Sequence, residues 1–591
     1  MKRHTQRSAP PRPVRLALAT ALVLGGLAAT AQAQQADPLA GLQWHLLNTG
    51  QTVPADTLPV AGNDLNVDGL YRNGIRGEGV VIGIVDDGLQ IAHPDLAANV
   101  AAVAGKNFAN GSNNPSPSDP DADNHGTMVG GIAGAVGANG VGVRGVAPAA
   151  TLKGFNVLAS DAQGSQLSNI EYSWWDGAEV ADVQVFNNSW GAGPGNPNLP
   201  LAFSQNDVSS YEQALSGTRG GRGGIYVKSA GNNFNNASIS RTQDVCTADT
   251  KNRNTGCVPA GRDPRNNLFN VITVGAVRAD GVRSSYSSTG SALWVSAFGG
   301  EYGLQAQFAP GLVARAYDPA IVTTDVTGCA QGSNTNASRE NTLDSNLSAL
   351  DSSCNYTAKM NGTSASAPMV SGVAALVLEA NPRLGYRDVK YILATTATRN
   401  HPNQPAVTLA DGRTLVPGWT VNAAGRAFSN WYGFGVVNAA RAVQVAETFQ
   451  PLGALVDSGW RNTTRRVAIG NTSAAAARLT VQVANGARNV ESVQLGFRVS
   501  HSNTRQLQFV LVSPSGTRSV VQPAFTAIGS GLQGTLAIQR NFSNWDLLSS
   551  NAFLDEAGTG TWTLEVTDMG QAANAASRGS LEFFKIRVLG H

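Results

Sequence analysis

Short runs of β-branched residues alternate with helix-like runs over the first three quarters of this 591-residue chain. These runs are residues 80–85, 127–136, 183–187, 224–229, 271–274 and 365–379. Buried strands separated by helices are typical of a parallel sheet that is covered on both faces. The predicted fold class is therefore α/β, a parallel sheet with helices on both faces. Stretches rich in Gly, Asn and Ser at 191–222, 233–266 and 329–358 are expected to be surface inserts.

After residue 450 the helix signals fade, and short alternating runs replace them. They are residues 478–483, 490–499, 507–512, 535–538, 561–566 and 581–588. Turn signals such as SPSGT at 513–517 separate these runs, which is typical of an all-β sandwich or jelly roll. We therefore expect a first domain over residues 34–449 and an all-β domain over 450–591.

The N-terminal residues 1–33 have the features of a signal peptide. Five basic side chains precede an apolar stretch at 16–29, and the small-residue sequence AQA at 31–33 offers a cleavage site. The apolar stretch is short for a membrane span, which makes an anchor the weaker alternative. Beyond this segment 37 basic and 40 acidic side chains remain, a net charge of −3, so the charge is no indication of nucleic-acid binding. We expect a secreted protein, extracellular or periplasmic, with no membrane anchor.

Four cysteines are present, and in an exported chain they are expected to form two disulfides. Four cysteines allow three connectivities. Our prediction is local pairing, Cys246 with Cys257 and Cys329 with Cys354.

Three segments carry residues suited to nucleophilic chemistry. A buried strand ends on two acids and a glycine at 80–88 (VVIGIVDDG), a histidine opens a helix at 124–131 (NHGTMVGG), and a serine enters another helix at 361–368 (NGTSASAP). A serine hydroxyl becomes a nucleophile when a histidine takes its proton and a carboxylate orients that histidine. Taken singly, each residue has a structural alternative as a turn former or a helix cap.

Together these blocks resemble the subtilisin-like serine proteases, specifically their kexin and proprotein-convertase branch. The order Asp86, His125, Ser364 is the order found in subtilisin. The segments NSWG at 188–191 and SAGN at 229–232 match the substrate-strand and oxyanion blocks of that family, and the β-rich tail looks like its P domain. The resemblance implies a serine endopeptidase with a subtilisin-like sheet, followed by a jelly-roll P domain that stabilises it.

The resemblance also assigns a role to each matched residue. Ser364 would be the nucleophile, His125 the general acid and base, and Asp86 the group that orients the imidazole. Asn232 would donate its side-chain amide to the oxyanion, together with the backbone N–H of Ser364. Because all four residues are present, a non-catalytic binding protein is the least supported alternative.

Substrate peptides are expected to bind as an added β-strand along the backbone of Ser189, Trp190 and Gly191. Asp87 matches a second aspartate of the convertases, which contacts a basic residue one before the cleavage position. Asp263 matches an aspartate at the base of their pocket for the arginine preceding the cut. Both would favour basic or dibasic sites. Broader specificity is the alternative, because Ser288 replaces a glutamate ligand of a second calcium and residues 192–196 replace an acidic cluster.

The resemblance implies one Ca²⁺ site. Its side-chain ligands would be Asp37, Asp95 and Asn139, and its carbonyl ligands those of Val136, Val141 and Val143, with Gly137 as an alternative to Val136. Ligation by oxygen atoms alone suits Ca²⁺. An ordinary Asn-Gly turn at 139–140 is the structural alternative.

Members of this family usually carry an N-terminal prodomain that assists folding. Here the matched region starts at Asp37, almost directly after the predicted cleavage site, so we expect no prodomain. The enzyme would then fold unaided or with a separate chaperone-like protein.

Overall fold

The computed structural model of the protein describes residues 36–191, 203–234, 248–345, 348–472, 474–526, 545–570 and 579–591, besides Met1. The predicted signal peptide, Cys246 and the predicted strand at 535–538 lie outside the described residues.

The first domain is built on a parallel sheet. Among the described residues its strand order is β2 (Val100–Lys106), β3 (Thr151–Phe155), β1 (Val81–Val85), β4 (Val185–Asn188), β5 (Ile225–Ser229), β6 (Val271–Val277) and β7 (Val295–Phe298). All neighbouring pairs run parallel. The predicted α/β class is thus confirmed.

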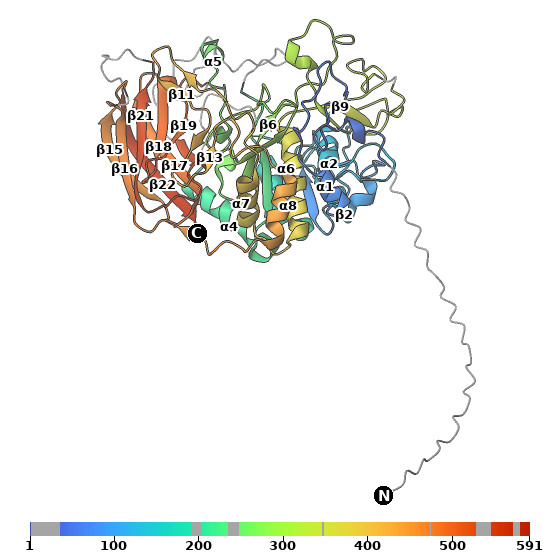
Figure 1. Ribbon diagram of the computed structural model, residues 1–591, viewed down its shortest axis with the longest axis horizontal. Helices are drawn as coiled ribbons and strands as arrows, with labels where there is room; N and C mark the ends of the chain where they lie inside the picture. Colours follow the sequence, from blue (N-terminus) through green and yellow to red (C-terminus); the bar gives the residue numbers. More distant parts are fainter. Residues whose placement is uncertain are drawn as a thin grey trace, which may run out of the picture.

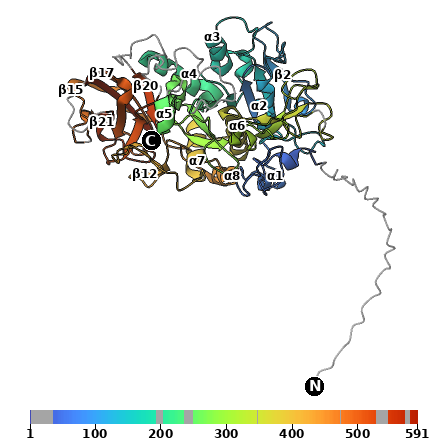
Figure 2. The same cartoon turned by 90° about the horizontal axis from the view of Figure 1, so that it is seen from above.

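Helices cover both faces of the sheet (Figure 2). They are α1 (Asp68–Arg72), α2 (His125–Gly134), α3 (Gln166–Glu171), α4 (Gln205–Gly221), α5 (Ala248–Arg253), α6 (Thr363–Ala380), α7 (Tyr386–Thr396) and α8 (Ala439–Thr448). Alternate strand residues point to opposite faces. Accordingly Val185 and Val227 join the core that contains α6, whereas Phe186 and Tyr226 pack with residues of α3 and α4.

The central helix α6 is buried along almost its whole length. Among the helices that the structure describes, it alone is long and apolar enough to cross a membrane by length and composition. Burial accounts for its composition, because every face of this helix contacts the protein core.

Two of the predicted surface inserts are partly wrong. In the insert at 233–266, residues 255–264 are buried. Residues 191–222 contain α4, whose first turn is closed by a capping box in which Ser204 and Asp207 bond to each other's backbone N–H. Val208, Tyr211 and Leu215 are buried against the sheet. The described part of the first domain also has three two-stranded antiparallel sheets: β8 (Ile321–Thr324) with β9 (Tyr356–Met360), β10 (Val407–Thr408) with β11 (Thr414–Val416), and β12 (Thr420–Val421) with β13 (Ala427–Phe428).

The described residues of the C-terminal region form two antiparallel sheets gathered at one end of the molecule, drawn in orange to red in Figure 1. One contains β14 (Val456–Asp457), β22 (Gly579–Gly590), β17 (Val490–His501), β20 (Trp545–Ser550) and β15 (Arg461–Ala468). The other contains β16 (Ala477–Val483), β21 (Gly560–Asp568), β18 (Leu507–Val512) and β19 (Arg518–Gln522). Aromatic and aliphatic side chains from both sheets form a common core, as in a β-sandwich.

The two regions are joined by buried polar contacts. Arg587 of β22 lies 2.6 Å from the carboxylate of Glu212 in α4, and Arg387 of α7 pairs with Glu491 of β17. The disulfide Cys329–Cys354 is formed as predicted, whereas the other predicted pair depends on Cys246, which is not described.

Candidate active site

Asp86 and His125 meet at the C-terminal edge of the sheet. Asp86 directly follows β1, and its backbone N–H donates to the carbonyl of Phe155 on β3. His125 is the first residue of α2, and its Nδ1 lies 2.8 Å from Oδ1 of Asp86. Asp86 is buried, whereas the histidine side chain is about one-third exposed. The carboxylate therefore fixes one ring nitrogen and leaves the imidazole within reach of solvent.

The start of α2 contacts the end of β1 through Gly126. A Cβ atom at this position would lie 2.0 Å from the carbonyl oxygen of Gly88. Asp87 bonds the same helix start, since its two carboxylate oxygens accept the backbone N–H groups of His125 and Gly126 at 3.0 and 2.6 Å. Asp87 thus provides the N-terminal hydrogen bonds that the side chain of Asn124 does not make.

Ser364 is the second residue of α6 and lies two positions after Gly362, whose φ of 92° lies in the left-handed region. Its hydroxyl donates to the carbonyl of Ser189 at 2.9 Å, and the hydroxyl of Ser189 donates to the carbonyl of Ser364 at 2.9 Å. Within the described residues no hydrogen bond joins Ser364 to His125. Such bonds often form only when substrate is present.

Asn232 lies three residues beyond β5, and it bonds the turn before the serine. Its Oδ1 accepts hydrogen bonds from the backbone N–H and the hydroxyl of Thr363 at 2.9 and 2.8 Å. These two hydrogen bonds to Oδ1 fix the orientation of the amide. Its Nδ2 lies beside Gly362, since a Cβ atom on that glycine would be 2.9 Å away. The amide nitrogen is thereby held next to the start of α6.

Trp190 connects the two halves of the site. Its indole Nε1 donates to the carbonyl of Val85, the residue before Asp86, at 2.8 Å. Trp190 also follows Ser189, which bonds Ser364. One edge of the sheet therefore brings together the ends of three strands, β1, β4 and β5, and the N-termini of two helices, α2 and α6.

Charge interactions shift the pKa values of the histidine and its neighbour. Burial lowers the pKa of His125, but the charge and hydrogen bond of Asp86 and the charge of Asp87 raise it to about 9. Burial and the nearby charge of Asp86 raise the pKa of Asp87 to about 7. The cluster has the composition of a metal site, but the hydrogen bonds just described already engage the polar atoms of Asp87 and the Nδ1 of His125.

The carboxylate of Asp263 already has partners within the protein. Its Oδ2 lies 3.0 Å from the ammonium of Lys228 on β5, and its Oδ1 accepts the backbone N–H of Arg265 at 3.0 Å. No sequence motif pointed to Lys228. A lysine within an otherwise apolar strand was the available signal, because buried lysines are almost always paired.

The predicted calcium ligands Asp37, Asp95 and Asn139 lie together. The backbone N–H of Asn139 donates to Asp37 at 3.0 Å, and its side-chain amide donates to Asp95 at 2.9 Å. Both carboxylates are buried, and burial raises the pKa of Asp95 to about 7. Two buried carboxylates beside one amide form a donor set of oxygen atoms that suits Ca²⁺. Arg144 already contacts Asp37 at 2.8 Å.

The loop from 136 to 143 encloses this group. The backbone N–H of Val136 donates to the carbonyl of Asp95, that of Val141 to the side chain of Asn139, and that of Val143 to the carboxylate of Asp95. The loop that would supply the carbonyl ligands is thus held around the predicted side-chain ligands.

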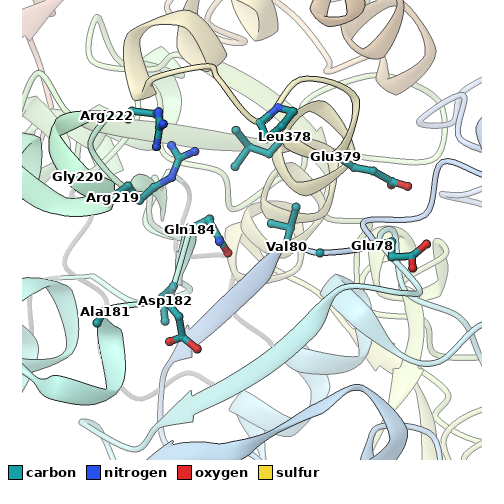
Figure 3. A pocket seen from close by; sticks show the side chains of 13 residues that line it. Glu78, Val80, Ala181, Asp182, Gln184, Arg219, Gly220, Arg222, Leu378 and Glu379 are labelled. Atoms are coloured by element: carbon teal, nitrogen blue, oxygen red, sulfur yellow. The ribbon is translucent and has the colours of Figure 1, made fainter.

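A cavity of about 610 Å³ lies at the opposite edge of the sheet (Figure 3). Its lining includes Val80 and Gln184, which precede β1 and β4, and Arg219 and Arg222 near the end of α4. Since the predicted catalytic residues follow the strands, this cavity is separate from them.

The comparisons with known proteins agree with this geometry. The sequence model described as the subtilase family matches residues 77–435. The chain belongs to the subtilase family. The model of the proprotein convertase P-domain matches residues 490–588, so a P domain lies behind the catalytic domain. The family match and the serine protease relatives given next make this subtilase a serine-type endopeptidase.

Named relatives match more than nine tenths of this subtilase. The extracellular serine protease of Aeromonas sobria is 38% identical, and the match covers 94% of this chain and 91% of the relative. Neuroendocrine convertase 2 of Homo sapiens is 26% identical over 94% of this chain and 74% of the relative. A crystal structure of the Aeromonas sobria serine protease in complex with a chaperone superposes with a TM-score of 0.82 at 36% identity, covering 94% of this chain and 95% of that one.

Proposed function

We propose that this subtilase is a secreted endopeptidase that cuts proteins through an acyl-enzyme on Ser364, with a preference for basic or dibasic sites. The observation that carries the proposal is the contact of 2.8 Å between Asp86 and His125, at the sheet edge where Ser364 and Asn232 also lie.

In this mechanism the hydroxyl of Ser364 leaves the carbonyl of Ser189 and passes its proton to His125 as it attacks the substrate carbonyl. Asp86 holds the imidazole in one tautomer and stabilises its protonated form. The side-chain amide of Asn232 and the backbone N–H of Ser364 donate to the developing oxyanion. His125 then protonates the leaving amine, and water, activated by the same histidine, releases the acyl group.

The backbone of Ser189, Trp190 and Gly191 would hold the substrate as an added strand. Asp87 would attract a basic residue at the second position before the cut, because it is a carboxylate beside the histidine. Asp263 is the carboxylate that the resemblance assigns to the first position, where it is paired with the ammonium of Lys228. The pairing of Asp263 with Lys228 supports the second candidate function, a subtilase with broader specificity.

Asp37, Asp95 and Asn139 would hold a structural Ca²⁺, with the carbonyls of the 136–143 loop completing the site. A bound cation supplies positive charge that keeps both buried carboxylates ionised and fixes the loop. The expected result of chelation is a lower unfolding temperature in the wild type and no change in Asp95→Asn. Equal changes in unfolding temperature in both proteins would show that Asp95 does not hold Ca²⁺.

Export and assisted folding are supported by the relatives. One relative is named an extracellular protease, and the solved structure of an Aeromonas protease contains a chaperone. A separate chaperone would serve this enzyme in the same way. Refolding of the purified chain alone to full activity would contradict that part of the proposal.

The test of function uses fluorogenic peptides with Lys-Arg, Ala-Arg or Ala-Phe before the cut. We expect Lys-Arg to be cleaved fastest, and Ser364→Ala, prepared identically, to be inactive. Equal rates on the three peptides would retain the protease and exclude the basic preference. A folded but inactive wild type would exclude the proposed function.

A further inference from the structure

One buried charge next to the active site has no role in the mechanism above. Lys228 is the fourth residue of β5, and its side chain is completely buried. It lies in the middle of the sheet, level with Asn188 of β4 and Thr273 of β6. Burying an ammonium group is costly, so its partners indicate what it does.

Within the part of the chain that the structure describes, the ammonium of Lys228 makes three contacts. It lies 3.0 Å from the carboxylate of Asp263, donates to the carbonyl of Trp190 at 2.5 Å, and is 4.8 Å from the centre of the Trp190 ring. The aspartate faces a second cation, because the guanidinium of Arg265 lies 3.9 Å from its other oxygen. One carboxylate therefore stands between two positive charges.

This ion pair lies directly behind the segment that would hold the substrate. Trp190 is the residue after Ser189, whose carbonyl accepts the hydroxyl of Ser364 at 2.9 Å. The carbonyl of Trp190 also accepts the hydroxyl of Ser229, three residues before Asn232. The Lys228–Asp263 pair is thus connected through Trp190 to the ends of β4 and β5, next to the reacting atoms.

Burial and charge act in opposite directions on both partners of this pair: burial lowers the pKa of Lys228, and the charge of Asp263 opposes that shift. Burial raises the pKa of Asp263, but the charges of Lys228 and Arg265 outweigh burial and hold that pKa below its ordinary value. The carboxylate is accordingly ionised, and its charge is balanced from inside the protein.

We propose that Lys228 sets selectivity at the position preceding the cut, because it neutralises Asp263 and weakens the attraction of that carboxylate for a substrate arginine. This inference rests on the proposed function. Asp87 bonds backbone N–H groups instead of a cationic side chain, so its attraction for a basic residue at the second position is retained. The substrates would then be peptides with a basic residue at the second position and a broad choice at the first.

The test compares Lys228→Met with the wild type on four peptides, with Arg or Phe at the first position and Lys or Ala at the second. Titration of active sites with a phosphonate normalises each preparation to correctly folded enzyme. We expect the Arg-to-Phe ratio of kcat/KM to rise about tenfold or more, since a unit charge a few ångströms away has been removed. The Lys-to-Ala ratio at the second position stays unchanged. Lys228→Arg, which keeps the charge, is the matched control and stays near the wild-type ratio.

A second comparison avoids the unpaired carboxylate that Lys228→Met leaves behind, which can prevent folding. Asp263→Asn keeps the lysine, whereas the double variant Lys228→Met with Asp263→Asn carries neither charge. We expect the Arg-to-Phe ratio to be about tenfold lower in Asp263→Asn than in the double variant. Equal ratios in these two proteins, or an unchanged or lower ratio in titratable Lys228→Met, would overturn the inference.

The two proposals fail in different ways. If the wild type shows no preference for Lys over Ala at the second position, Asp87 does not have the role that the proposed function gives it. The effect of Lys228 is measured as a change between variants at the first position, so it is tested independently of that result.

Discussion

His125 lies between two carboxylates that act on it differently. Asp86 bonds its ring nitrogen, whereas Asp87 bonds the backbone N–H and acts on the ring through its charge. Together they stabilise the protonated imidazole and raise its pKa to about 9, above the ordinary value of about 6.5. The resulting stabilisation of the fold is complete below pH ~6.5 and is lost as the pH rises through about 9.

The charge of Asp87 should therefore be visible in the pH profile. The base must be neutral, so removing a charge that favours its protonated form extends activity to lower pH. We expect Asp87→Asn to shift the acidic limb of kcat/KM to lower pH on an Ala-Arg peptide, which has no basic residue to contact Asp87. Asp161→Asn, a substitution of an exposed carboxylate, is the control. An unshifted limb in Asp87→Asn would contradict the assigned interaction.

Asn232 is expected to act mainly on the rate of the chemical step. Removing an oxyanion donor of this kind lowers kcat by about 100–1000-fold, a magnitude measured in subtilisin itself. We expect such a loss in Asn232→Ala with little change in KM. Asn233→Ala, at the exposed neighbouring position, should stay within about threefold of the wild type, a change too small to reflect lost transition-state binding. Similar losses in both variants would point to a general disturbance of the loop.

At the residue scale, the sequence motifs predicted which groups meet but not how each is bonded. Asp86 and His125 are in contact as expected. The hydroxyl of Ser364 bonds Ser189, and Asp263 is paired with Lys228. These partners are distant in sequence and depend on side-chain geometry, which no local motif specifies.

At the scale of elements, the approach of α2 to β1 positions the histidine. The missing side chain of Gly126 permits this contact, because a Cβ atom would overlap the carbonyl of Gly88. We expect Gly126→Ala to lower kcat/KM about 100-fold, since a displacement of about 1 Å has effects of this size. Gly217→Ala, in α4 with no atom within 4 Å of the added Cβ, is the matched control and should retain activity. Full activity of Gly126→Ala would show that the helix can shift without consequence.

The elements with strong periodic signals were predicted well. The observed strand β18 coincides with the predicted run at 507–512, and β1 and α6 differ from prediction by two residues or fewer at each end. Helix α4 was missed because Gly, Ser and Asn dominate the segment around it. Its buried residues Val208, Tyr211 and Leu215 follow helical spacing, and the pair Ser204–Asp207 was a capping signal within reach of sequence analysis.

At the scale of the whole molecule, the P domain contacts the catalytic domain through charged groups from both. Glu212 of α4 is buried, and Arg587 of β22 bonds it and also Asp457. The composition of the two regions indicated two domains, but the residues that join them could not be predicted, because the docking geometry depends on both folded surfaces.

This interface gives a prediction of stability. Removing one partner of a buried ion pair leaves an uncompensated charge. We expect Arg587→Ala to lower the free energy of unfolding by about 3 kcal/mol in a urea titration. Arg466→Ala removes an arginine of the same domain whose side chain is 79% exposed, and it should cost less than about 1 kcal/mol. Equal, small effects would mean that the interface does not stabilise the enzyme.

Ser364 is proposed as the nucleophile of an Asp–His–Ser endopeptidase. The most direct measurement is labelling of the purified full-length protein with a serine-directed phosphonate, followed by mass spectrometry of the labelled peptide. We expect one modified residue, Ser364, and a loss of peptidase activity in proportion to labelling. The Ser364→Ala protein should not be labelled. A folded wild type that resists the label, or a Ser364→Ala protein that still cleaves peptides, would contradict this role of Ser364.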